Sequence, residues 1–359
     1  MYTMFHRAIM AAGMLGAIWI IPAQAQFYDK KTLTIVVNYG VGGNADLSAR
    51  IFQKNLRRHI AGAPTIVVQN MPGAGGALAM NSLGLEIGFK ADGYTAGFFG
   101  LNPPALIAGD PGLRVSLNHF EMVGAVRDWN VAYVRKDAVP GIQRPEEIIK
   151  ARELFAGGYS KSNANDTRSS LALEVLGIKY RMITGFPGTA DLNKAMLQNE
   201  VNFANSALPG YVRQAVPQIM NTGIGMPLFY FPTTGPDGKI GKVDSLERMG
   251  IIGFAEVYER IHGAPPGGVK FDALLLMCDL DSAMHGVIAL PKGAPSEAVA
   301  ELRRAFSQLR EDPEFREEYE KTTGEKPEIV LHDEMTPLLK RFAQTPENIK
   351  KVFQDLIAQ

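Results

Sequence analysis

The sequence predicts an α/β protein in which a parallel sheet lies between two layers of helices. The apolar run 33–37 is typical of a buried strand, and it leads through a glycine-rich loop into a helical pattern. The same strand–loop–helix order recurs further along the chain. The length, 359 residues, suffices for two domains that each bury a core.

The first strand is followed by the loop 38–44 and by a helix over about 45–60, capped near Asn44 or Asp46. We predict a binding site for a carboxylate or phosphate here. It would be formed by the backbone N–H groups of Gly42, Gly43 and Asn44 together with the helix dipole. Segment 40–45 also fits the dinucleotide fingerprint G-x-G-x-x-G/A. The predicted second strand ends in Gln69-Asn70 without the carboxylate that a ribose needs, which disfavours a nucleotide.

The next predicted elements are a strand at 65–69, a helix at 77–85 and a strand at 95–99. A second unit begins near 126–134. A helix opening at 144–147, a strand at 154–159, a polar loop at 160–167 and a helix at 168–176 complete it. The two polar loops, one from each domain, are expected to face each other across a cleft.

The last third of the chain predicts helices at 297–310 and 313–323, and two more that begin at Thr336-Pro337 and Thr345-Pro346. Their apolar stripes are expected to pack on the first domain or to reach across to the second as a latch.

The N-terminus has the pattern of a secretory signal peptide over 1–25. Arg7 precedes an apolar stretch at 8–21, and Ala23-Gln24-Ala25 supplies the small residues of a cleavage site. Cleavage after Ala25 predicts a periplasmic protein, and an uncleaved anchor is the alternative. No cysteine follows the cleavage site, so lipid attachment to a new N-terminal cysteine is excluded.

Composition narrows the function. The chain has 37 basic and 37 acidic residues, which gives no electrostatic case for nucleic acid or an anionic membrane. Cys278 is the single cysteine, so an intrachain disulfide and C-x-x-C sites are excluded, and its thiol is expected to be buried.

No catalytic, metal or cofactor pattern is present in the sequence. The six histidines are scattered, and neither H-E-x-x-H nor G-x-S-x-G occurs. Segment 279–282 (DLDS) lacks the glycine and glutamate of a calcium loop and is expected to be a turn. No catalytic residue, metal or cofactor is therefore expected, although an active site assembled from distant residues stays open.

Three motifs lie in order: TIVVNYGVGGNADLSAR at 34–50, NMPGAGG at 70–76 and DGYT at 92–95. In these motifs the chain resembles the receptor subunits of tripartite tricarboxylate transporters, the Bug family of extracytoplasmic solute-binding proteins. The family pattern runs ITIVVPY-x-PGG-x-x-D-x-x-AR, then N-x-PGAGG, then PDGYT. Asn38 and Val41 replace the usual prolines, and the second loop carries charges at Lys161, Asp166 and Arg168.

The resemblance implies a type II periplasmic-binding-protein fold: two three-layer α/β domains with a hinge and an interdomain cleft. Domain 1 comprises 27–125 and a return over 286–359 with the C-terminal helices, and domain 2 comprises 126–285. The hinge is expected near 124–127 and 284–290.

The resemblance also implies a monomeric receptor that binds a small organic acid in the cleft and docks on permease subunits of a tripartite tricarboxylate transporter. An extracytoplasmic sensor module and an exported enzyme on the same scaffold are the alternatives.

Each candidate ligand contact has a structural alternative: helix capping for the polar side chains, solvation for the lysine and a plain turn for the segment 185–188. Asp46 is expected to cap its helix or brace its loop, and Asp166 and Arg168 to complement the start of theirs. The expected ligand-binding residues are Tyr39, Gly42, Gly43, Asn44, Ala45, Ser160, Lys161, Ser162, Asn163, Thr167, Gly185 and Phe186.

Overall fold

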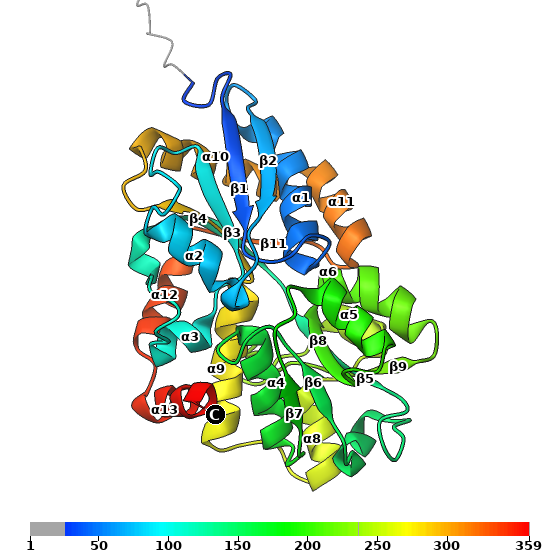
Figure 1. The fold of residues 1–359 in the computed structure, drawn as a ribbon. Helices are drawn as coiled ribbons and strands as arrows, with labels where there is room; N and C mark the ends of the chain where they lie inside the picture. The colour runs from blue at the N-terminus through cyan, green and yellow to red at the C-terminus, as the bar shows by residue number, and fades with distance from the viewer. Residues whose placement is uncertain (1–25, 236, 359) are drawn as a thin grey trace, which may run out of the picture.

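The computed structural model describes residues 26–235 and 237–358. These residues form two lobes, each built on one β-sheet (Figure 1). The predicted signal peptide at 1–25 lies outside the described residues. Every helix in the described ranges is too short or too polar to cross a bilayer.

The first lobe is built on a sheet of strand order β11-β4-β10-β3-β1-β2. β1 pairs in parallel with β2 and β3, as the sequence predicts. The expectation of a wholly parallel sheet is wrong, because β10 runs antiparallel to β3 and β4, and β11 antiparallel to β4. The strands are β1 (Thr32–Val37), β2 (Thr65–Asn70), β3 (Thr95–Phe99), β4 (Phe120–Arg127), β10 (Gly286–Pro291) and β11 (Glu328–Leu331).

The second lobe has strand order β7-β6-β8-β5-β9. β6 is parallel to β7 and β8, whereas β5 is antiparallel to β8 and β9. In each sheet, one of the antiparallel strands lies next to a crossing between the lobes: β10 in the first sheet and β5 in the second. No local residue pattern encodes the direction of these strands. The strands are β5 (Asn130–Arg135), β6 (Phe155–Gly157), β7 (Arg181–Ile183), β8 (Phe203–Ala207) and β9 (Gly225–Tyr230).

Alternation along the strands produces the layers. In β1, Ile35 and Val37 enter a core with Phe52 of α1 (Asn44–Leu56), while Val36 packs on the opposite face. In β5, Val131 and Tyr133 enter one cluster, and the neighbouring Ala132 and Val134 enter another. Both sheets are therefore covered on both faces, and the three-layer expectation is confirmed.

The chain crosses between the lobes twice. It leaves the first sheet at Arg127 and enters the second at Asn130; it returns from α9 (Val269–Ala283) into β10 at Gly286. β4 and β10 are hydrogen-bonded neighbours, so the two crossings run side by side. The predicted domain limits 27–125, 126–285 and 286–359 stay a prediction.

Helix α9 corrects the expectation of a turn at 279–282, because those residues lie in its last turns. The helix is buried along most of its length, and it holds Cys278 in the interior, where burial raises the pKa of the thiol to about 12. The buried thiol agrees with the sequence expectation.

Helix α4 (Ala164–Val175) also departs from the prediction. It starts at Ala164 and not at Arg168, because Asn163 supplies the cap. The helix expected to open at 144–147 is a 3₁₀ segment, Pro145–Lys150.

The C-terminal helices reach both lobes. α13 (Glu347–Ala358) packs against α3 (Pro103–Ala108) of the first lobe and against α9 and α4. α12 (Met335–Ala343) packs on α3 and α9 (Figure 1). Phe353 of α13 is fully buried. The two expectations therefore each hold for part of this region, because α10 (Ser296–Glu311) packs on the first lobe, whereas α13 reaches α4 of the second.

Helix α6 continues into a π-helical segment, Tyr211–Met220. Apart from α1 and α9, the helices are α2 (Ala77–Gly84), α3 (Pro103–Ala108), α4 (Ala164–Val175), α5 (Thr189–Leu197), α6 (Leu208–Gly210), α7 (Asp244–Arg248), α8 (Phe254–His262), α10 (Ser296–Glu311), α11 (Pro313–Thr323), α12 (Met335–Ala343) and α13 (Glu347–Ala358).

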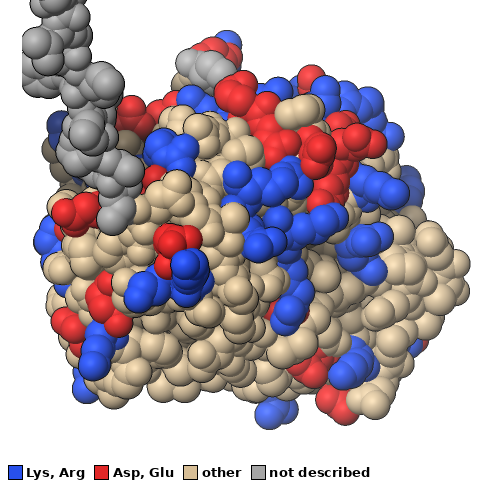
Figure 2. Space-filling model, turned by 90° about the horizontal axis from the view of Figure 1, so that it is seen from above, with Lys and Arg blue, Asp and Glu red and all other residues tan. Residues whose placement is uncertain are grey.

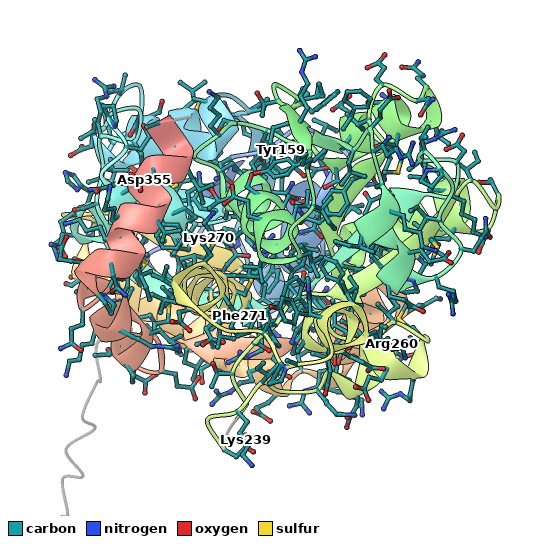
Figure 3. All side chains as sticks on the ribbon, turned by 90° about the horizontal axis from the view of Figure 1, so that it is seen from below. Tyr159, Lys239, Arg260, Lys270, Phe271 and Asp355 are labelled. Carbon is teal, nitrogen blue, oxygen red and sulfur yellow. The ribbon has the colours of Figure 1, made fainter. Side chains whose placement is uncertain are left out.

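Asp279 of α9 holds one end of the stretch 233–245 by hydrogen bonds. The sequence leaves the role of this stretch open. The Asp279 carboxylate accepts both the backbone N–H and the hydroxyl of Thr234 at 2.6 Å, and it pairs with Arg341 of α12 at 2.6 Å. Beyond this anchor, Lys239 lies on a loop that projects from the molecule (Figure 3).

On the face seen in Figure 2, basic and acidic side chains lie next to one another. This mixture agrees with the equal numbers of the two charges in the sequence and gives that face no strong field of one sign.

Candidate functional site

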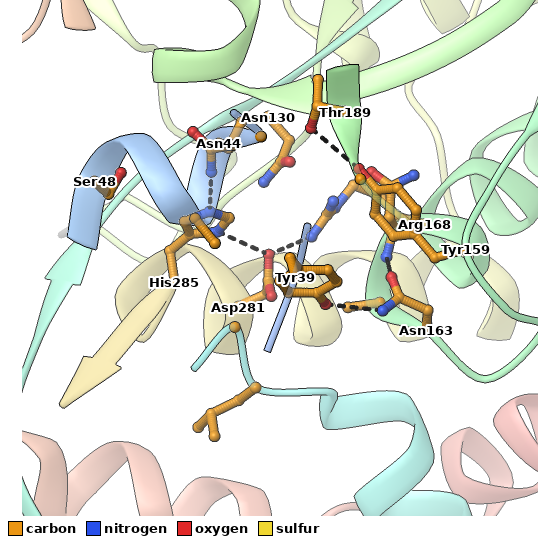
Figure 4. A pocket seen from close by; sticks show the side chains of 18 of the residues that line it. Tyr39, Asn44, Ser48, Asn130, Tyr159, Asn163, Arg168, Thr189, Asp281 and His285 are labelled. Atoms are coloured by element: carbon orange, nitrogen blue, oxygen red, sulfur yellow. Dashed lines mark hydrogen bonds and ion pairs between the residues drawn. The ribbon is translucent and has the colours of Figure 1, made fainter. Parts of the chain in front are cut away.

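A cavity of about 60 Å³ is lined by residues of both lobes (Figure 4). It lies where strands of the two sheets end and their loops lead into helices, the edge at which open α/β sheets bind ligands. The lining residues are Tyr39, Gly43, Asn44, Ala45, Ser48, Phe98, Gly100, Leu101, Asn130, Tyr159, Asn163, Ala164, Asn165, Arg168, Gly188, Thr189, Ala207, Asp281 and His285.

Helices α1 and α5 begin face to face at this cavity. Gly43 precedes α1 and Gly188 precedes α5, and neither helix start is capped by a side chain. A Cβ on Gly43 would lie only 3.6 Å from the backbone nitrogen of Thr189. The first amides of a helix lack intrahelical partners and carry the positive end of its dipole. Two such ends, one from each lobe, form a seat for a negatively charged group.

Helix α4 brings a third N-terminus. The side-chain oxygen of Asn163 accepts the backbone N–H of Asn165 at 2.8 Å. The Asn165 side chain is only 7% exposed and lines the cavity, yet its Nδ2 has no hydrogen-bond partner within the described structure. An unsatisfied buried donor costs about 1–3 kcal/mol, so this amide marks a place where an acceptor would be stabilised.

The glycine loop itself contributes fewer amides than the sequence predicts. The N–H of Gly42 donates to Asp46 Oδ2 at 2.9 Å, and that of Gly43 points to the Gly40 carbonyl at 3.4 Å. Both groups therefore have partners inside the loop. The backbone donors left at the cavity are those at the start of α1, at Asn44 and Ala45, because no preceding turn supplies acceptors for them.

The two loops that precede α1 and α4 are braced in the same way. Asp46 and Asp166 both occupy the third position of their helices, and each carboxylate turns back onto the loop. Asp46 accepts from Gly42 and pairs with Arg50 at 2.9 Å, and Asp166 accepts the Tyr159 N–H at 2.8 Å.

Asp46 and Asp166 differ in charge. Burial raises the pKa of Asp166 to about 8 against the effect of its backbone donors. Burial also acts on Asp46, but Arg50 and the Gly42 N–H outweigh it and lower its pKa. Of the two roles expected for Asp46, the loop brace is the one observed.

The lobes are hydrogen-bonded to each other around the cavity. Nδ2 of Asn163 donates to the Tyr39 hydroxyl at 2.9 Å and to the Gly75 carbonyl at 2.7 Å. Gln214 donates to the carbonyl of Gly42 from the second lobe. A Cβ at Gly75 would overlap the Ser160 hydroxyl, so glycine is needed there for this approach.

The Tyr39 side chain lines the cavity. Its hydroxyl accepts from Asn163 and keeps its own proton for donation, and burial raises its pKa well above the ordinary value.

A buried charged network forms another part of the wall. Arg168 of α4 pairs with Asp281 of α9, and Asp281 Oδ2 lies 3.6 Å from Nδ1 of His285 (Figure 4). Burial opposes the charge of Asp281, but Arg168 and His285 outweigh it and lower the pKa of this carboxyl. Arg168 thus joins α4 to α9. This corrects the expectation that Arg168 only complements the start of its own helix.

Asn44, the first residue of α1, positions His285. The Asn44 Oδ1 accepts the backbone N–H of Gly210 at 3.1 Å, which turns its Nδ2 toward His285 Nε2 at 2.9 Å. This orientation favours a lone pair on Nε2 and the proton on Nδ1, toward Asp281. Burial lowers the pKa of His285, but Asp281 and Asp128 outweigh it and the net pKa is raised.

The structure separates the predicted ligand residues into groups. Tyr39, Gly43, Asn44, Ala45 and Asn163 line the cavity. Lys161 and Thr167 line a separate depression on the outer side of α4, and Lys161 is exposed, so solvation explains it. Gly185 and Phe186 line a neighbouring cavity of about 240 Å³ beside Gly75. Gly42, Ser160 and Ser162 do not line the central cavity.

Sequence reasoning missed the cavity residues that come from distant segments. Ser48 lies one helical turn after Asn44 on α1, a relation visible in the sequence once the helix is placed. Asp281 and His285 have the same spacing across the end of α9, which the sequence did not reveal as a helix. Asn130, Arg168 and Thr189 share no local pattern that would mark them.

Known proteins share this architecture. No protein-family model matches the chain. A UPF0065 protein of Bordetella bronchiseptica is 24% identical over 315 residues, which cover 86% of this chain and 81% of that protein. The solved structure of the periplasmic binding protein BugD superposes with a TM-score of 0.61, at 18% identity over 92% of this chain and 96% of its own. The chain has the fold of a Bug-type periplasmic binding protein.

A second solved structure, Rpa4515 of R. palustris with adipate, gives a TM-score of 0.66 at 18% identity, over 90% of this chain and 97% of that chain. The resemblance to Bug-type receptors that the three sequence motifs predict is thus confirmed, together with the two-lobed α/β fold.

Proposed function

We propose that this chain is an exported receptor that binds a small carboxylated compound between its lobes and delivers it to a tripartite tricarboxylate-type membrane transporter. The observation that carries the proposal is the meeting of two uncapped helix N-termini, α1 from one lobe and α5 from the other, at one cavity that the unpartnered Asn165 amide also lines. A helix terminus stabilises a partly buried anion by up to about 2 kcal/mol.

The contacts between the lobes support a receptor that signals occupancy. A carboxylate at the helix starts touches both lobes only when they are closed, so binding shifts the population toward the closed form. The relatives add to this: Rpa4515 was solved with adipate, and MatC of Rhodopseudomonas palustris with malate.

The same geometry favours binding without catalysis. His285 and Asp281 resemble a base and its orienting carboxylate, but the Asn44 amide lies at Nε2, the position from which a base would activate a nucleophile. The ring is therefore placed as part of the wall.

The test is a thermal-shift series with a panel of organic acids, after native mass spectrometry of the freshly purified protein. An acid present at a hundred times its Kd should add about 2.7 kcal/mol to the unfolding free energy. Gly43→Val fills the space between the starts of α1 and α5 and should abolish that gain. Gly267→Val, at an exposed site with nothing within 4 Å, is the matched control.

Retention of the full shift by Gly43→Val, with the control unchanged, would place the anion elsewhere. Absence of binding for every acid in the panel would reject the receptor proposal.

A further inference from the structure

The charges that line the cavity cancel one another. Arg168 and Asp281 are the lining residues with permanent charge, and they are paired. The side chains are 3% and 5% exposed, respectively. Arg168 also donates to Asn205 at 3.2 Å and stacks over the Phe231 ring at 5.4 Å. Two of its donors are thus engaged inside the protein, and its charge is already paired with that of Asp281.

The wall around His285 is rich in carboxylates. Asp281 lies 3.6 Å from one ring nitrogen and Asp128 lies 3.9 Å from the other. Two carboxylates therefore face one imidazole and one guanidinium. A further carboxylate placed beside Asp281 would meet a like charge at short range in a poorly solvated site, which is unfavourable.

Other parts of the lining have the reverse character. They are the starts of α1 and α5, which no side chain caps, and the unpartnered Nδ2 of Asn165, and all of these are donors. The cavity thus offers donors for an anion and, elsewhere in its lining, an acceptor in the Asp281 carboxylate. The exposed Lys161 lies in another depression and cannot supply a second cationic contact here.

We propose that the cleft selects a short monocarboxylic acid whose other end is uncharged and carries a hydroxyl, and that it discriminates against di- and tricarboxylates. This inference rests on the proposed function and deepens it. The carboxylate lies at the helix starts, and the hydroxyl donates toward Asp281. The cavity is small, about 60 Å³, which favours a short acid.

Matched pairs of acids test the selection directly. In 3-hydroxypropionate against malonate, and in 4-hydroxybutyrate against succinate, a terminal CH₂OH is exchanged for a carboxylate at the same chain length. We expect the hydroxy acid of a pair to bind at least tenfold more tightly by titration calorimetry at fixed ionic strength. Equal or tighter binding of the dicarboxylate would overturn the inference while leaving the carboxylate receptor intact.

A charge-removing variant gives a second readout. Asp281→Asn frees Arg168 and removes the like charge, so affinity for the dicarboxylate should rise at least tenfold relative to the hydroxy acid. Asp279→Asn removes the same charge from the same helix, but its side chain contacts Thr234 and Arg341 outside the cavity. This control should keep the wild-type preference.

An unchanged preference in folded Asp281→Asn would count against the role of this carboxylate. Should that variant not fold, the wild-type pairs decide alone. If neither member of any pair nor any other acid binds, the proposed function falls together with this inference.

Discussion

Single side chains in this protein act on two segments at once. Asn163 caps α4 with its oxygen and joins the first lobe with its nitrogen. Asn44 likewise accepts from the second lobe and orients His285. Amides suit these positions because one group donates and accepts together. Replacement by aspartate would keep one half of each function and lose the other.

The single side chain of Asp166 should make the unfolding free energy depend on pH. Its folded pKa, about 8, lies above the ordinary value because the carboxyl is buried. The folded state therefore binds this proton more tightly, and the stabilisation is complete below pH 3.8 and lost as pH rises through about 8. Asp166→Asn mimics the protonated form and should flatten this decline. Urea unfolding of both proteins at about pH 5 and about pH 8.5 measures the difference, and parallel curves would contradict it.

The cavity shows how much of a site local sequence can predict. The start of α1 and the cap Asn163 follow from a strand, a glycine loop and a polar residue before a helix. Arg168 lies far before Asp281 and His285 in the chain, and only packing of α4 on α9 brings the three together. Spacing in sequence cannot encode that meeting.

At the scale of helices and strands, the predictions hold best for amphipathic helices whose ends are marked by proline or glycine. Asp312-Pro313 and Gly324 bound α11 as predicted, and α10 follows its apolar stripe. Helix α9 was not predicted, because it is buried nearly all round and so lacks the polar face that periodicity requires. The antiparallel directions of β5 and β10 also have no local signal.

Asp312 should stabilise α11 measurably. Its Oδ1 accepts the N–H of Glu314 at 2.9 Å, and its Oδ2 pairs with Arg58 and His59. Asp312→Ala should lower the unfolding free energy by about 1–2 kcal/mol, while Glu317→Ala on the exposed face of the same helix should change little.

The same carboxylate should contribute to acid sensitivity. Burial opposes its charge, but Arg58 and His59 outweigh it and lower the pKa of Asp312 to about 2. Its stabilisation is present above pH 3.8 and is lost as pH falls through about 2. Guanidinium unfolding at about pH 7 and about pH 2.5 checks both points: a variant as stable as the parent at neutral pH would refute the assignment.

At the scale of the whole molecule, the lobes are held together by direct contacts at the cavity rim and by the C-terminal helices behind it. Gly75 is favoured at the rim, because its φ of +61° would strain another residue and an added Cβ would overlap the Ser160 hydroxyl. The PGAGG motif thus serves the approach of the lobes.

Gly75→Ala should hold the lobes apart. Gly88→Ala introduces the same kind of backbone strain, at a φ of +79°, but with nothing within 4 Å of its Cβ. We expect a larger radius of gyration by small-angle scattering and weaker acid binding for Gly75→Ala alone. Equal behaviour of the two variants would show that strain, and not the approach of the lobes, is responsible.

Burial of Cys278 inside α9 has a practical consequence. Because the sequence holds no other cysteine, a thiol introduced on the surface of each lobe can be labelled with a dye while the native sulfur stays unreactive. Energy transfer between the dyes would then follow the opening and shutting of this protein in solution, without a background to subtract.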